Sequence, residues 1–96
     1  MSEELVPSPE LSRLAAALAV LDEHAELNHR YRRLITDSRS ALSAPLLRTT
    51  QARGIGKKLL VLVKAAGPGF PDTLAAADRT ALEDGLAQAD ELVFHT

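Results

Sequence analysis

The sequence predicts an all-α protein, a small bundle of three to four helices with a long first helix. Leu and Ala dominate the apolar residues, and both favour helix over strand. Apolar residues recur at spacings of three and four along most of the chain, which is the period of an amphipathic helix. Four of the five residues of one short segment, Gly67–Pro71, are Pro or Gly, and we therefore interpret this segment as a connector.

The 96 residues allow one domain with a modest core. We expect residues 1–8 to be a flexible N-terminal tail and residues 9–96 to form a single helical domain. Ser8, Pro9 and Glu10 are typical of a helix start, with Ser as the N-cap, Pro at the first helical position and Glu in the first turn.

The first predicted helix covers residues 9–36. Its apolar residues follow a seam close to a heptad, which begins with Leu11 and Leu14 and continues through Leu18 and Leu21. A helix of this length would extend beyond a local core, toward a partner or a second copy. We therefore predict that Leu18 and Leu21 lie in a core or in a partner-binding seam.

The middle of the chain is more interrupted. A short helical turn is expected at residues 40–44 and a short helix at 46–53, and Gly54–Gly56 is interpreted as a break. A further helix is predicted for residues 57–66, because Gly67 suits the position after a helix and Pro68 prevents its continuation. The last helix is expected to begin near Asp72.

An α+β fold is the alternative. Leu59–Val63 and Glu91–His95 are both compatible with β-structure and would then be two short paired strands. Periodicity alone does not separate a buried strand from a buried helix in a run of five residues.

Charge is segmented along the chain. Residues 1–28 contain six acids and one base, residues 29–66 nine bases and one acid, and residues 67–96 six acids and one base. In one interpretation the acidic flanks fold beside the basic centre and complement it. In the other, the basic centre is a surface for a polyanion.

The segment Gly54–Ile55–Gly56–Lys57–Lys58 resembles the turn of the helix-hairpin-helix family. In that family a G-x-G turn directs backbone N–H groups at a DNA phosphate, and a following Lys assists. The resemblance implies a phosphate site, whereas a packing break between two helices is the alternative. The phosphate-binding residues would be Gly54, Gly56, Lys57 and Lys58.

A basic cluster with one aromatic residue lies in the second half of the predicted first helix. Arg30 and Arg33 share one side of the helix and Arg32 points away from them, while Tyr31 is suited to stacking on a base or on a partner's side chain. The expected partner-binding residues are therefore Arg30, Tyr31, Arg32 and Arg33, together with Leu18 and Leu21.

Several function classes have no support. The chain has no Cys, and it contains no nucleophile elbow, Walker loop or dinucleotide fingerprint. Glu26 and His29 have the spacing of a di-iron bundle pair, but one pair is not a set of ligands. We expect no enzyme, metal or cofactor. The acidic first residues and the shortness of every apolar run favour a cytoplasmic protein without a secretory signal or membrane segment.

The function expected from these features is protein–protein association, as an adaptor, regulator, inhibitor or assembly subunit. Partners would be another protein or further copies of the chain. The alternative is a nucleic-acid-binding regulator that uses the basic segment 30–58. The composition favours a GC-rich bacterial or phage genome as the source.

Overall fold

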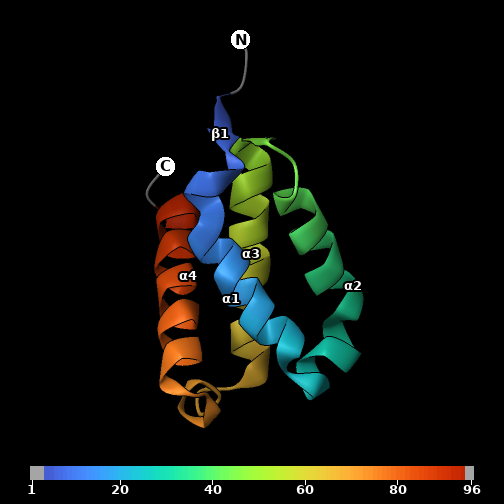
Figure 1. Ribbon diagram of the computed structural model, residues 1–96, viewed down its shortest axis with the longest axis vertical. Coiled ribbons are helices and arrows are strands. Elements are labelled where there is room, and N and C mark those ends of the chain that lie inside the picture. Colours follow the sequence, from blue (N-terminus) through green and yellow to red (C-terminus); the bar gives the residue numbers. More distant parts are fainter. Residues whose placement is uncertain (1–3, 95–96) are drawn as a thin grey trace.

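Four helices form the described part of this computed structural model. Figure 1 shows how they are arranged. The structure describes residues 4–94, leaving aside the side chains of residues 25–27. The helices are α1 (Ser12–Glu23), α2 (Ala25–Leu42), α3 (Thr49–Ala66) and α4 (Ala76–Phe94). Two short strands and two 3-10 turns complete the described chain: β1 (Leu5–Pro7), β2 (Leu46–Arg48), Ser8–Leu11 and Pro71–Thr73. The prediction of a small bundle of three to four helices is confirmed.

Helix α1 lies at the centre of the packing. It crosses in front of α3, with α4 on one side and α2 on the other (Figure 1). The Leu seam predicted from the sequence forms the core, because each of its four leucines is almost completely buried. The large apolar side chains that are as fully buried come from all three other helices and from β2: Ile35, Leu47, Leu59, Leu62 and Leu82.

The predicted single helix over residues 9–36 is wrong. Helix α1 ends at Glu23 because His24 adopts an extended backbone (φ −83°, ψ 106°), and α2 then turns back beside α1. Asp22 holds this corner, since its backbone carbonyl and its carboxylate both accept from the Asn28 amide. Such local side-chain bonds compete with helix continuation. The carboxylate of Asp22 also accepts from Arg39, which ties the corner to the second half of α2.

The two strands occupy places that the sequence did not indicate. β1 pairs with β2 in antiparallel register, with Val6 opposite Leu47. Part of the expected N-terminal tail is therefore a strand, and the expected helix over 46–53 begins only at Thr49. The α+β alternative is wrong as well, because residues 59–63 lie within α3 and residues 91–94 within α4; His95 is outside the described residues.

No break occurs at Gly54–Gly56, which lies inside the continuous helix α3. Gly56 instead allows two helices to approach closely, since a Cβ placed there would lie 3.3 Å from the Ala89 Cα of α4. Gly85 has the same role where α4 meets α1. A Cβ on Gly85 would overlap the Ala17 side chain and lie 2.8 Å from the Arg13 carbonyl oxygen. These two glycines set the spacing of the helices.

Gln88 supplies a buried polar link between α4 and the start of α1. The 3-10 turn Ser8–Leu11 passes into α1, where the Leu14 N–H donates to Gln88 Oε1 at 3.1 Å. The Gln88 amide in turn donates to the Glu10 carbonyl. Gln88 thus provides partners for backbone groups at the beginning of a helix, which lack helical partners of their own.

Replacing Gln88 by Met should lower the free energy of unfolding by about 1–3 kcal/mol, because the Leu14 N–H would stay buried without an acceptor. Urea denaturation followed by circular dichroism would measure this change. Asp84→Met is a suitable control, since Asp84 is exposed one turn earlier in α4 and its replacement should change stability by no more than about 0.5 kcal/mol. Equal effects of the two substitutions would contradict the role given to Gln88.

Candidate contact surfaces

Leu18 and Leu21 belong to the core of the single chain. Both side chains are 0% exposed, in contact with apolar residues of the other helices. Of the two predicted roles, the core is therefore confirmed for them. The expectation that they contact a partner is wrong for the chain in this conformation, because neither side chain reaches the surface.

The arginines of the basic cluster lie on the surface of α2. Arg30, Arg32 and Arg33 are all exposed. Tyr31 is half-buried and packs against the core, and its backbone (φ −120°, ψ 29°) introduces a kink in α2. The ring of Tyr31 is therefore engaged by the core rather than presented as an open stacking platform between the arginines.

The predicted phosphate site at Gly54, Gly56, Lys57 and Lys58 does not have the expected geometry. A helix interior directs each backbone N–H to the carbonyl four residues earlier, so these groups are not aimed at a ligand. Gly56 is also buried against α4. The prediction of a G-x-G phosphate turn is wrong, and the resemblance to the helix-hairpin-helix family does not extend to the structure.

Helix α3 presents a mixed surface that we call the α3 stripe: Lys57, Val61 and Lys64. These residues are spaced by four and three, so they share one face of the helix, and all three are exposed. Val61 is 57% exposed, so its apolar side chain lies at the surface between the two ammonium groups. The stripe lies on the side of α3 opposite its core residues Leu59 and Leu62.

Helix α4, the neighbour of α3, presents the opposite charge. Its outer residues Glu83, Ala87 and Asp90, which we call the α4 stripe, have the same spacing of four and three and are all exposed. The α3 and α4 stripes therefore have matching spacing, opposite charge and an apolar residue in the middle of each.

The pair of strands, here called the ribbon, has a buried face and an exposed face. Val6 and Leu47 face the core, whereas Leu5, Pro7 and Leu46 lie on the outer face. Side chains alternate along a strand, and directly paired residues share a face, so these three apolar residues lie together with Arg48. Leu5 is 52% exposed and Leu46 is 51% exposed.

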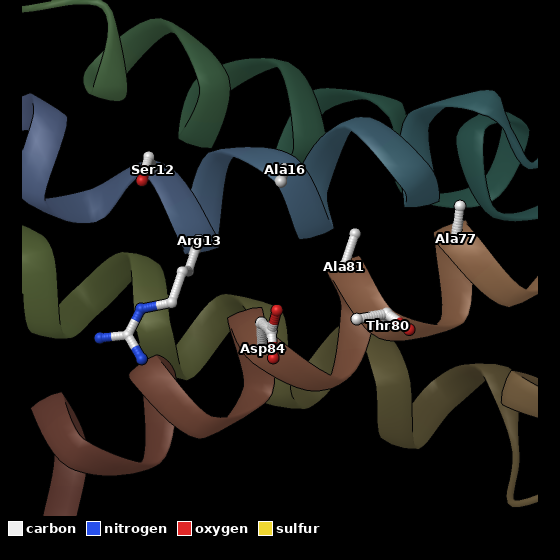
Figure 2. Close-up of a pocket in the computed structure, with 7 residues that line it drawn as sticks. All are labelled: Ser12, Arg13, Ala16, Ala77, Thr80, Ala81 and Asp84. Atoms are coloured by element: carbon white, nitrogen blue, oxygen red, sulfur yellow. The ribbon is translucent and has the colours of Figure 1, made fainter.

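A groove of about 430 Å³ runs between α1 and α4. Most of its side chains are small, and in Figure 2 Ala77 and Ala81 point from α4 toward α1. Its charged members, Arg13 and Asp84, are exposed, and Arg13 makes an ion pair with Glu91 at 3.6 Å. The groove therefore has no buried acid, base or nucleophile that would indicate catalysis.

No group of three or more potential metal ligands occurs among the residues that the structure describes. The pair suggested by the sequence, Glu26 and His29, is only partly covered, because the Glu26 side chain lies outside the described residues. Within the described chain, no helix is both long enough and apolar enough to cross a membrane.

The charge segments contact one another at separate points in the fold. The ion pair between Asp22 and Arg39 connects the acidic first segment with the basic centre. Arg53 of the basic centre also reaches the last segment, where it donates to the Leu92 carbonyl. Within residues 4–94, however, Lys57 and Lys64 form no ion pair, so the basic centre is complemented only in part.

Comparison of the chain with protein-family models, with curated proteins and with solved structures found no match.

Proposed function

We propose that this chain is a small non-enzymatic protein that acts by protein–protein association, as an adaptor, regulator, inhibitor or assembly subunit. The outer face of the ribbon supports this function best. Leu5 and Leu46 expose about half of their side chains there, although Val6 and Leu47 already use the inner face to cover the core. A cluster of exposed apolar residues is typical of a contact surface.

The gain from covering this face is moderate. Complete burial of a Leu side chain contributes about 1.5–3 kcal/mol, and each of these two leucines is already half-buried. Each would therefore contribute about 1 kcal/mol to a complex, which corresponds to roughly a fivefold to tenfold change in affinity. A contribution of this size to the affinity suits a reversible complex.

A photoreactive side chain in place of Leu46 should form a crosslink to a discrete protein in cells that contain the natural partner. Replacing Leu5 by Ser in the same chain should reduce the yield about fivefold to tenfold, because Leu5 lies on the same face. The control places the photoreactive group at Ser40, an exposed position on α2, where the product should be absent. The proposal fails if the two positions give the same products.

Nucleic-acid binding is the second candidate function, favoured by the exposed arginines of α2 and the exposed lysines of the α3 stripe. Phosphate contacts release counterions, so such binding would weaken steeply with salt. Fluorescence anisotropy with mixed-sequence DNA and RNA, for wild type and a Lys57→Glu, Lys58→Glu variant, separates the two functions. Tight, salt-sensitive binding that the variant loses would replace association with nucleic-acid binding.

A further inference from the structure

We propose that the face formed by α3 and α4 binds a second copy of the chain as a two-fold dimer. The α3 stripe of each copy would lie against the α4 stripe of the other. This inference rests on the proposed association function and identifies a partner for it. It concerns a surface separate from the outer face of the ribbon.

The α3 stripe favours a partner with carboxylates on both sides of a small apolar residue. Val61 would lose contact with water on association, which favours burial, while Lys57 and Lys64 would oppose the approach of another cationic surface. A purely apolar partner would leave both ammonium groups without a counter-charge at the edge of the contact. The suitable occupant is a helix face with acids at the two outer positions.

The α4 stripe of the same chain has these properties. Glu83 and Asp90 lie seven residues apart, as do Lys57 and Lys64, and Ala87 occupies the position equivalent to Val61. The methyl group of Ala87 leaves room for the larger Val61 side chain. Complementary charge at matched spacing specifies both the partner and its position along the helix.

The heights of the two stripes agree within one chain. Helices α3 and α4 are antiparallel neighbours, as Figure 1 shows, and two contacts fix their relative position: Gly56 against Ala89 and the Arg53 guanidinium on the Leu92 carbonyl. From this register Lys57 lies near the height of Asp90 and Lys64 near that of Glu83.

A two-fold axis parallel to both helices places each residue of the second copy at the same height as in the first. The α3 stripe of one copy can then lie against the α4 stripe of the other with their charges level. Each copy then offers its lysines to the carboxylates of the other, and the contact occurs twice in one closed dimer. The attraction between exposed charges is modest and is screened by salt. The expected dimer is therefore weak and tighter at low ionic strength.

Glu83 and Lys64 provide the sharpest test, because Asp90 already interacts within its own chain. Lys64→Glu places two like-charged pairs in the dimer, and Glu83→Lys does the same with the opposite sign. In sedimentation experiments at low salt, each variant alone should dimerise at least about tenfold more weakly than wild type. An equimolar mixture of the two variants should dimerise as well as wild type, since both contacts again join opposite charges.

Restoration in the mixture requires a contact between chains, because a pair within one chain would not respond to mixing. Arg33→Glu is the matched control: it makes the same charge change at an exposed position of α2 and should leave dimerisation unchanged. Circular dichroism of each variant would verify that the helices are retained.

Three results would overturn the dimer. The first is that wild type remains a monomer at every concentration, and the second is that Lys64→Glu dimerises as well as wild type. The third is that the mixture of the two variants dimerises as weakly as each variant alone. Loss of salt-sensitive DNA binding on Lys64→Glu would instead assign the α3 stripe to a polyanion and would also contradict the association function. A failed dimer with an intact crosslink from position 46 would leave that function standing.

Discussion

Replacing Gly85 by Ala should lower the free energy of unfolding by about 1–3 kcal/mol. Helix propensity alone predicts the opposite sign, a gain of about 1 kcal/mol, because Ala is the better helix former. The packing decides the sign. The new methyl group would overlap the Ala17 side chain and lie 2.8 Å from the Arg13 carbonyl, so α1 and α4 would have to move apart. Overpacking a core in this way typically costs about 1–3 kcal/mol.

The control for Gly85 is Gly54, which lies in the interior of helix α3. A Cβ on Gly54 meets nothing within 4 Å, so Gly54→Ala should raise stability by about 0.5–1 kcal/mol through propensity alone. Urea denaturation of both variants, followed by circular dichroism, measures the two changes. If Gly85→Ala were as stabilising as Gly54→Ala, the close crossing of α1 and α4 would be wrong.

These glycines also show where sequence reasoning reached its limit. A Gly within a helical pattern marks either an end of the helix or a close approach of another helix, and the choice depends on a residue far away in the sequence. Ala89 decides the case for Gly56 and Ala17 for Gly85. Periodicity was reliable for the Leu seam because it depends on one helix alone.

The division of the predicted first helix at His24 likewise depends on contacts between residues apart in the sequence. The apolar stripe continues past residue 24, so it predicts one helix, whereas the corner depends on bonds from Asp22 to Asn28 and Arg39. Nothing in the local sequence pattern distinguishes an Asp that holds such a corner from an Asp that is simply exposed on a continuous helix. Gln88 left a clearer signal, since it is a polar residue that shares one side of its helix with the small residues Ala81 and Gly85.

The sequence predicted some of the exposed residues but not how they are arranged into surfaces. Exposure of Arg30, Arg32 and Arg33 follows directly from their positions on an amphipathic helix. The α3 stripe could have been found in the same way, because Val61 lies on the side of its helix opposite Leu59 and Leu62. The ribbon could not, since it depends on pairing between segments about 40 residues apart in the sequence.

Leu18→Asp should unfold the protein. Leu18 is 0% exposed, and a carboxylate without a partner in an apolar core costs several kcal/mol in addition to the lost packing. Small domains have a total stability of about 5–15 kcal/mol, so this change removes most or all of it. Circular dichroism at room temperature should show loss of helix, and thermal scans should show no cooperative transition.

Val61→Asp makes the same chemical change at an exposed position and separates folding from association. Its side chain is 57% exposed, so the helices and the thermal transition should be retained, while the proposed dimer should weaken because the contact between Val61 and Ala87 is lost. If Leu18→Asp kept its thermal stability and lost only its association, Leu18 would lie in a seam between chains. If Val61→Asp unfolded as well, α3 would be covered on its outer side, and the surface proposed for the second copy would not exist.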